Sequence, residues 1–389
     1  MESLCNPVLH SGIENIVKAK DEYYYTSDGR TFIDLESGIW CASLGHGHDK
    51  INHIIKKQLD SLSHISKRVL PSYINLIAEK LLKIAEIDGK VMFLNTGSEA
   101  IEFSMTMAKL IHKTGKLISF TDNYISAYGQ ATKIDEKIVI KPCLKCSKSN
   151  CDINCPAIKD KITEYSVFIF DPFCFSRMIL KPPVKLIKTL ETEIRKKNGI
   201  IIVDEITTGL GRTGKWFGYN HFNLKPDMVV LGKSLGNGYP VSAVIIEKSI
   251  IKEVEKTDFS YYQSHQNDPL GCKVAEAVID VLQAENLVER AHESGEVFLT
   301  FLRKDLDNIN GVKDIRGVGL LIGIELKKEI SVEKVYQRLA EKGIIIGISL
   351  KFNMLNINPP YTINSGLIPE ISKKIKESIV EVEQSDQLD

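Results

Sequence analysis

The chain between residues 90 and 284 alternates short apolar runs with longer stretches in which apolar residues recur every three to four positions. This pattern predicts strands that alternate with amphipathic helices. The apolar runs are rich in β-branched residues, which is typical of strands buried on both faces of a parallel sheet. The pattern therefore indicates an α/β fold with a mostly parallel sheet covered by helices. We predict strands at 90–95, 116–120, 166–170, 199–204, 227–231 and 242–247, and a helix at 97–113.

The pattern changes after residue 284. From there we predict a strand at 319–326 between helices, one of them at 331–342, and a last helix near 367–382. This order is typical of a smaller α+β domain, which the N-terminal segment is expected to join. The predicted domains are a large one at 46–284 and a small one formed by 1–45 and 285–389.

The composition narrows the classes of function. The 389 residues include 50 basic and 50 acidic ones, so the concentrated basic face that nucleic acid or an anionic membrane requires is not expected. No apolar run is long enough to span a bilayer, and the first residues do not resemble a secretory signal. Eight cysteines spread over this length fit a reducing compartment better than a disulfide scaffold. We expect a cytoplasmic protein with small-molecule ligands.

Three polar features follow predicted strands, where ligands of open α/β sheets bind. The motif NTGSEA at 95–100 opens a helix whose free backbone N–H groups could hold a phosphate. Asp204 ends one apolar run, and Lys233 follows another. Singly, each has an ordinary explanation: a helix start, a turn residue and a solvated surface lysine. Together they supply the phosphate cup, the acid and the amine that a pyridoxal phosphate site requires.

The chemistry of pyridoxal phosphate explains each feature. A lysine desolvated beside the cofactor is neutral enough to form a Schiff base with its aldehyde. A carboxylate next to the pyridine nitrogen keeps that nitrogen protonated, so the ring accepts electrons from a substrate carbanion. These requirements predict Lys233 as covalent anchor and proton carrier, and Asp204 as the partner of the ring nitrogen.

Longer motifs resemble those of the class III pyridoxal phosphate-dependent aminotransferases. The segment at 200–246, which includes IIIVDEITTGLGRTGKWFGYNHF and DMVVLGKSLGNGYPVSAVII, is similar to the signature of that family. The resemblance implies the fold-type I architecture, with a seven-stranded large domain, a small domain from both termini, and a homodimer with active sites at the interface. Further similar stretches occur in family order at 25–48, 93–109, 264–272 and 356–363.

The resemblance also implies a role for each matching position. Lys233 would form the Schiff base, and Asp204 would pair with the pyridinium. The ring would lie between Ile206 and Tyr124, and Thr207 stands where the family has a glutamine. The phosphate would be held by Gly97, Ser98 and, from the neighbouring subunit, Ser264.

The residues expected to bind the substrate differ from those of the family. The candidate residues are Trp40, Asp171 and Asn356. Asn356 stands where the family has an arginine that binds a substrate carboxylate, and a neutral amide replaces such bidentate recognition poorly. We therefore expect Asp171 to lack its arginine partner, and the donor to present a second amine or a neutral polar group there. The alternative is that Asp171 bonds to backbone or to a neighbouring lysine such as Lys181. Lys351 and Arg177 are candidate substitutes for the arginine, although surface positions suit both.

Four cysteines lie close together in the stretch PCLKCSKSNCDINCPA at 142–157. Their spacing, C-x2-C-x4-C-x3-C, is compatible with zinc or an iron–sulfur cluster. A loop of reduced thiols near the subunit interface is the alternative, and the sequence leaves the choice open. The four residues are Cys143, Cys146, Cys151 and Cys155.

We predict a pyridoxal phosphate-dependent aminotransferase that moves an amino group from an amine or ω-amino donor to an oxo acceptor by a ping-pong mechanism. An aminomutase, racemase or amine lyase of the same fold would share every residue named above but would need a single substrate. A regulator that binds the cofactor without catalysis is the alternative from another class. The presence of both Lys233 and Asp204 argues against it.

Overall fold

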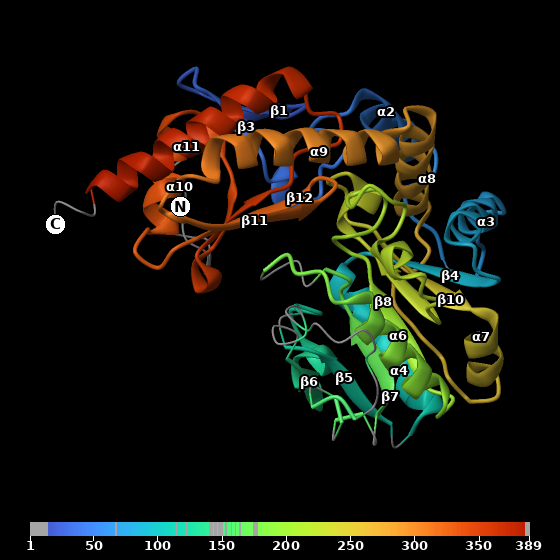
Figure 1. The fold of residues 1–389 in the computed structure, drawn as a ribbon. Coiled ribbons are helices and arrows are strands. Elements are labelled where there is room, and N and C mark those ends of the chain that lie inside the picture. The colour runs from blue at the N-terminus through green and yellow to red at the C-terminus, as the bar shows by residue number, and fades with distance from the viewer. Residues whose placement is uncertain are drawn as a thin grey trace.

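The computed structural model describes residues 15–385 with short gaps. In Figure 1, a large sheet occupies one region of the molecule, and the N- and C-terminal segments lie together in another. No helix of the described part is long and apolar enough to cross a membrane. The residues that are not described are 1–14, 67, 114, 122, 140–142, 144, 145, 147–150, 152, 153, 157, 160, 163, 164, 174–177 and 386–389.

The large sheet has seven strands among the described residues, in the order β4-β10-β9-β8-β7-β5-β6. Strand β10 runs antiparallel to β4 and β9, and all other neighbours are parallel. Because β8 and β9 are parallel neighbours, their carboxyl ends lie side by side. The strands are β4 (Gly89–Leu94), β5 (Lys116–Phe120), β6 (Glu136–Ile138), β7 (Tyr165–Phe170), β8 (Ile200–Asp204), β9 (Met228–Leu231) and β10 (Ser242–Glu247).

Both faces of this sheet are buried. Side chains alternate along a strand, so Ile202 of β8 packs in one apolar cluster while its neighbour Ile201 packs in the cluster on the other face. This double burial explains the uninterrupted apolar runs of the sequence. The covering helices are α4 (Gly97–Ile111) and α7 (Lys248–Val254) on the first face, and α6 (Val184–Arg195) and α8 (Pro269–Ala284) on the second.

The two ends of the chain form two smaller sheets, and strands from both ends meet in the first of them. One has the order β1-β2-β3-β13, in which the C-terminal strand β13 runs parallel to β3. The other, β11-β12-β15-β14, is antiparallel throughout. The strands are β1 (Ile16–Lys20), β2 (Tyr23–Thr26), β3 (Thr31–Asp34), β11 (Val312–Val318), β12 (Leu321–Leu326), β13 (Ile344–Ile345), β14 (Gly347–Ser349) and β15 (Met354–Ile357).

Helices complete both regions. Helices α2 and α3 contact α8. Helices α9 and α10 contact the smaller sheets, and α11 packs on α9 and α10. The short helix η3 follows β9 directly and begins with Lys233. The remaining elements are α1 (Ser37–Trp40), α2 (Asp49–Leu59), α3 (Tyr73–Ala85), α9 (Leu287–Leu306), α10 (Val332–Glu341), α11 (Ile368–Ser385), η1 (Gly129–Lys133), η2 (Gly218–Phe222), η3 (Lys233–Gly236), η4 (Leu350–Phe352) and η5 (Ser365–Leu367).

The predicted α/β fold is confirmed. The helix expected at 97–113 is α4, and the one expected near 367–382 is α11 (Ile368–Ser385). Strand β6 was not predicted, because three residues are too few to show a period. The domain boundaries at 45/46 and 284/285 stay a prediction.

Candidate active site

Lys233 lies beyond the carboxyl end of β9, on the first residue of η3. Its backbone φ is +42°, in the left-handed region that costs a non-glycine residue free energy. The amine Nζ donates a hydrogen bond of 2.5 Å to Thr207 Oγ1 and lies 4.6 Å from the ring centre of Trp40. Burial lowers the pKa of this amine, and the nearby Asp204 carboxyl opposes that shift. Loss of solvent thus favours the neutral amine that a nucleophile requires.

Asp204 closes β8, the strand next to β9, and is 6% exposed. The backbone N–H of Ile206 donates to its Oδ1 at 3.0 Å. Burial, followed by the charge of Asp171, raises the pKa of Asp204 well above its usual value, although Lys233 acts in the opposite sense. The ionised acid is therefore costly in the protein alone, and a cationic group beside it would stabilise it.

The start of α4 provides a place for a phosphate. Thr96 caps this helix by accepting from Glu99 N at 3.2 Å, while N–H groups of a first helical turn have no partner within the helix and attract anions. A Cβ on Gly97 would lie 2.6 Å from Ile206 Cδ1, so only glycine leaves room between the helix start and this side chain. These features, with the desolvated amine and the buried acid, fit pyridoxal phosphate.

Two more predicted residues lie on segments that border this helix start. Ser98 Oγ accepts from Ala127 N at 3.1 Å, which fastens the segment bearing Tyr124. Tyr124 is 45% exposed, and burial, with a smaller contribution from Asp204, raises its pKa. Ser264 is exposed, and the preceding Gln263 donates from Nε2 to Glu99 Oε1 at 2.6 Å. Contact of Ser264 with a neighbouring subunit's phosphate stays a prediction.

Trp40 reaches Lys233 from an unusual turn. Residues 37–40 of α1 all have positive φ, between +50° and +65°. Such a left-handed turn costs about 1–2 kcal/mol for each non-glycine residue. Asp34 holds it together, because its two carboxylate oxygens accept from Glu36 N and Gly38 N, both at 2.8 Å. The turn thus brings an aromatic ring over the amine.

The substrate-side acid Asp171 accepts a hydrogen bond from the backbone. Asp171 is 4% exposed, and its Oδ1 accepts from the backbone N–H of Phe173 at 2.9 Å. A backbone group therefore provides one hydrogen bond to this carboxylate, and the expectation that Asp171 lacks an arginine partner stays a prediction. Of the substitutes for the arginine, Arg177 lies outside the described residues, and Lys351 lies in η4 with Nζ 5.3 Å from the Phe352 ring centre.

An acid that was not predicted, Glu36, lies close to Asn356. Asn356 lies in β15, buried, opposite Gly347 of β14. A Cβ on Gly347 would lie 3.1 Å from Glu36 Oε1 and 3.3 Å from Asn356 Cβ, so both side chains border the same small space. Burial, then the charge of Asp34, raises the pKa of Glu36 to about 7. The signal available in the sequence was the pair of acids, Asp34 and Glu36, among the apolar residues of FIDLESGIW at 32–40.

A second unpredicted group is the buried cation Arg212, which is 1% exposed. Its Nη1 donates to the carbonyls of Leu320 and Pro359, and its Nη2 donates to Ser43 Oγ at 3.1 Å. Ser43 Oγ in turn lies 2.6 Å from Ser234 Oγ, next to Lys233. The arginine is therefore linked to the lysine turn through Ser43 and Ser234.

The four cysteines of the 142–157 loop are individually described, although much of the loop is not. Burial raises the pKa of Cys143 to about 11, with further contributions from Cys155, Cys151 and Cys146. The pKa of Cys151 is raised by burial and then by Cys155. The thiols therefore lie near one another, but among the described residues they form no group close enough to share a metal ion. The choice between metal and reduced thiols stays open.

Comparison with known families matches residues 9–129 and 160–379 to "Aminotransferase class-III". An ornithine aminotransferase of Halalkalibacterium halodurans is 32% identical over 85% of each chain. A [LysW]-aminoadipate semialdehyde/glutamate semialdehyde transaminase of Sulfolobus acidocaldarius is 27% identical over 95% of each chain. A leucine/methionine racemase of Thermococcus litoralis is 28% identical over 95% of this chain and 91% of its own.

The same fold occurs in solved structures. The ornithine aminotransferase of Toxoplasma gondii, described with partial occupancy of pyridoxal phosphate at its active site, superposes with a TM-score of 0.87. That alignment covers 99% of this chain and 94% of the other, at 24% identity. The predicted fold-type I architecture is thereby confirmed.

Proposed function

The chain belongs to the class-III aminotransferase family, and we propose that Lys233 and Asp204 form its catalytic centre and that its donors carry a terminal amine. Pyridoxal phosphate is its cofactor, and an amino group moves from an amine donor to an oxo acceptor. The observation that carries the site assignment is the desolvated Lys233 amine, which lies beside a buried acid at the ends of adjacent strands.

Lys233 would anchor the cofactor and move the substrate proton. When bound, pyridoxal phosphate supplies the aldehyde that takes up the amino group and the ring that accepts electrons. Thr207 Oγ1 accepts from Lys233 Nζ, and Trp40 covers the amine. These two contacts hold Nζ in one place and limit its access to water, so that the same atom can take a proton from the substrate carbon and return it.

Asp204 would hold a proton on the ring nitrogen. Its high pKa in the protein alone falls when a cation lies beside it, because an opposite charge favours the ionised acid. Gly97, Ser98 and Ser264 would hold the phosphate, with Ile206 and Tyr124 on either side of the ring. Glycine at position 97 fits this role, since a larger residue would push against Ile206.

The donor preference follows from the charge around Asn356. Glu36 borders the same space as this amide, and a carboxylate beside a substrate carboxylate would repel it. An amine, in contrast, would stabilise ionised Glu36. Trp40, Asp171 and Asn356 are thus proposed to contact a donor whose distal group is an amine or a neutral polar group. A relative named for ornithine is consistent with a donor that carries a terminal amine, but ornithine also carries a carboxylate, so the distal-group preference rests on Glu36 alone.

A donor screen tests this preference. Diamines and amino alcohols are compared with glutamate, alanine and 4-aminobutyrate by the absorbance change of the bound cofactor during the first half-reaction. We expect a diamine to give the highest kcat/KM. If a carboxylate donor is best and Asn356→Ala leaves that preference unchanged, the assignment of this space to the donor is wrong.

The racemase relative marks the main alternative reaction. A racemase, aminomutase or lyase needs one substrate, whereas transamination needs two in ping-pong order. Steady-state rates measured at several concentrations of both substrates separate these cases. Parallel double-reciprocal lines are expected here.

Assembly and location form a separate part of the proposal. We infer a homodimer, because Ser264 is exposed on a loop beside the helix start that would bind phosphate. A cytoplasmic location fits the eight cysteines of the chain. Sedimentation of the loaded enzyme and fractionation of cells test these two points.

A further inference from the structure

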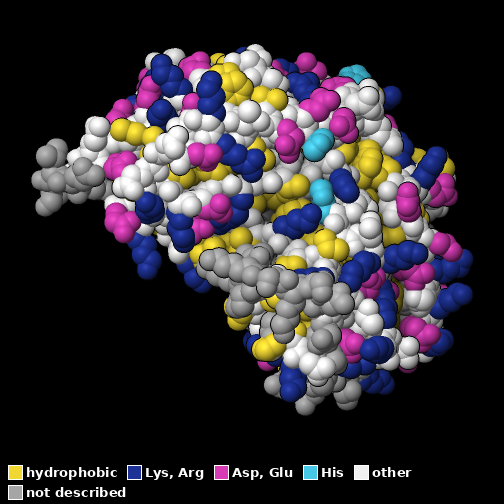
Figure 2. Space-filling model, in the orientation of Figure 1, with side chains coloured by type: hydrophobic (Ala, Val, Ile, Leu, Met, Phe, Trp, Pro, Cys, Tyr) yellow, Lys and Arg dark blue, Asp and Glu magenta, His cyan; other side chains and the backbone are white. Residues whose placement is uncertain are grey.

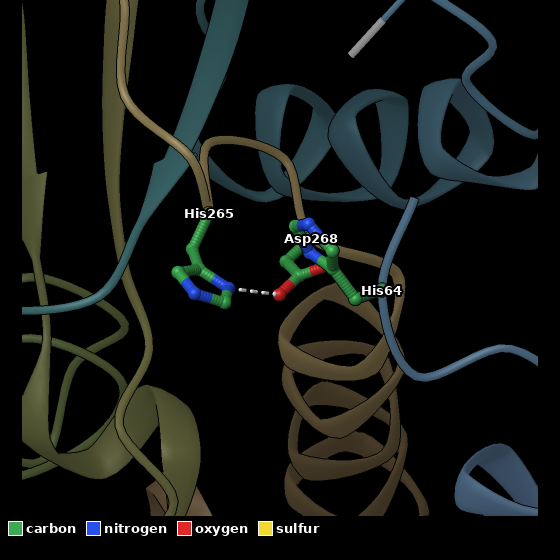
Figure 3. Close-up of side chains that lie close together, drawn as sticks. All are labelled: His64, His265 and Asp268. Atoms are coloured by element: carbon green, nitrogen blue, oxygen red, sulfur yellow. Dashed lines mark hydrogen bonds and ion pairs between the residues drawn. The ribbon is translucent and has the colours of Figure 1, made fainter. Parts of the chain in front are cut away.

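Two histidines and one aspartate meet on the surface where the segment after α2 approaches the start of α8 (Figure 3). His64 Nδ1 lies 3.0 Å from Asp268 Oδ1, and His265 Nδ1 lies 2.8 Å from Asp268 Oδ2. The two imidazole centres are 4.7 Å apart. One donor atom from each residue lies within 4.8 Å of the other two. Both histidines are exposed in the single chain.

Asp268 is turned away from its own helix. It is the N-cap of α8, a position where aspartate normally accepts from the backbone N–H groups of the first turn. Its side chain makes no such capping hydrogen bond. Both oxygens point to the imidazoles instead, as the dashed line to His265 shows for one of them in Figure 3. The carboxylate of Asp268 therefore contacts the two histidines instead of capping the helix.

We propose that His64, His265 and Asp268 bind a divalent transition-metal ion, with Zn²⁺ as the representative. Two imidazole nitrogens and one carboxylate oxygen are a donor set that zinc accepts at about 2.0–2.2 Å, with water at the remaining position. Donor atoms at that distance from one ion lie about 3–3.5 Å apart, so small side-chain rotations bring the three residues into place. On binding, each neutral imidazole coordinates through Nδ1 and carries its proton on Nε2.

The site would join two segments that are far apart in the sequence. His64 follows α2, and Asp268 starts α8, which contacts both α2 and the helix η3 that begins with Lys233. His265 directly follows Ser264. A bound ion would therefore fix the start of α8 and its preceding loop, and its effect would be on thermal stability rather than on the chemical step.

The test uses the full-length enzyme loaded with pyridoxal phosphate. Zn²⁺ and Co²⁺ are titrated by calorimetry into the wild type, His64→Gln, His265→Gln and the double variant. His53→Gln, at an exposed histidine of α2, is the matched control. Stoichiometry matters, because the cysteine loop could bind zinc as well. The double variant should lose one equivalent of metal per chain, and each single variant should bind that equivalent at least about 100-fold more weakly, since loss of even an outer-shell partner costs about 10–100-fold.

Two further readouts identify the site. The visible bands of Co²⁺ lost in the double variant should be those of nitrogen and oxygen ligands, without thiolate charge transfer. Zn²⁺ should raise the Tm of the wild type and of His53→Gln in proportion to the logarithm of its concentration. The Tm of the double variant should rise less, because only the cysteine loop could still bind zinc there. If the double variant keeps the metal stoichiometry, the cobalt bands and the Tm increase of the wild type, the proposal is wrong.

Discussion

At the scale of single residues, burial lowers the pKa of the Lys233 amine, whereas its charged neighbour Asp204 acts in the opposite sense. The nearest hydrogen-bonding side chain is the neutral hydroxyl of Thr207. The ring of Trp40, whose centre lies 4.6 Å from Nζ, helps to exclude water from the amine. A lysine on the surface would remain protonated and would be a poor nucleophile at neutral pH.

Lys233→Ala should fold but lose the covalent link to the cofactor. Borohydride treatment followed by peptide mass spectrometry should label Lys233 in the wild type and no lysine in the variant. Transamination should fall by several orders of magnitude, because the nucleophile and the proton carrier are the same atom. Lys181→Ala, which removes another lysine whose pKa burial lowers, should keep the label. Labelling of a different lysine in Lys233→Ala would contradict the assignment.

Asp204→Asn should retain the fold and weaken the electron sink. An amide cannot stabilise a protonated ring nitrogen, so activity should fall by more than about a hundredfold, as for the loss of one charged contact to a reacting system. The loaded variant should also show a shifted cofactor absorbance. A near-normal kcat would mean that another group serves the ring nitrogen.

At the scale of elements, the strands were predictable and the left-handed turn was not. Runs such as Ile200 to Val203 are apolar at every position because both faces of β8 are buried, and that pattern is visible in one sequence. The turn at 37–40 depends on Asp34, whose partners lie two, four and twelve residues further along. Nothing in the local propensity of Ile39 predicts a positive φ.

Asp34→Asn should loosen this turn. An amide supplies one acceptor oxygen where the carboxylate supplies two, so a buried N–H loses its partner at a cost of about 1–3 kcal/mol. The Tm should fall, and the fluorescence of Trp40 should change in a Trp216→Phe background, since the chain has two tryptophans. Asp60→Asn, at an exposed position after α2, serves as control. An unchanged Trp40 signal would show that other contacts hold the turn.

At the scale of the whole molecule, the candidate site is assembled from three distant parts of the chain. The large sheet contributes Asp204 and Lys233, the N-terminal segment contributes Glu36 and Trp40, and the C-terminal strand β15 contributes Asn356. The cofactor residues were predictable because they follow strands of one sheet, whose ends must converge. Glu36 was not, since its meeting with Asn356 depends on the packing of the two termini.

The distribution of charge on the surface matches the balanced composition of the sequence. Basic and acidic side chains are interspersed over the face shown in Figure 2.

Glu36→Gln tests this meeting of the two termini through its dependence on pH. Burial raises the pKa of Glu36 from 4.5 to about 7. For an acid whose pKa is raised on folding, stability is fully present below the unfolded value and is lost as pH rises through the folded one. Glutamine does not titrate, so the Tm of the variant relative to the wild type should increase between pH 4.5 and about 7. The gain should be at most about 3.5 kcal/mol in unfolding free energy, at about 1.4 kcal/mol per pKa unit.

The same variant should also change the choice of donor. If ionised Glu36 attracts a distal amine, Glu36→Gln should lower kcat/KM for diamines while that for amino alcohols changes little, because a neutral hydroxyl does not depend on the charge. Glu79→Gln, at an exposed position of α3, should alter neither stability nor donor choice. Equal effects of Glu36→Gln on both donor classes would show that Glu36 shapes the pocket without recognising the amine. A pH-independent difference in Tm would show that the acid is solvated, and the space beside Asn356 would then be open to water rather than to a substrate cation.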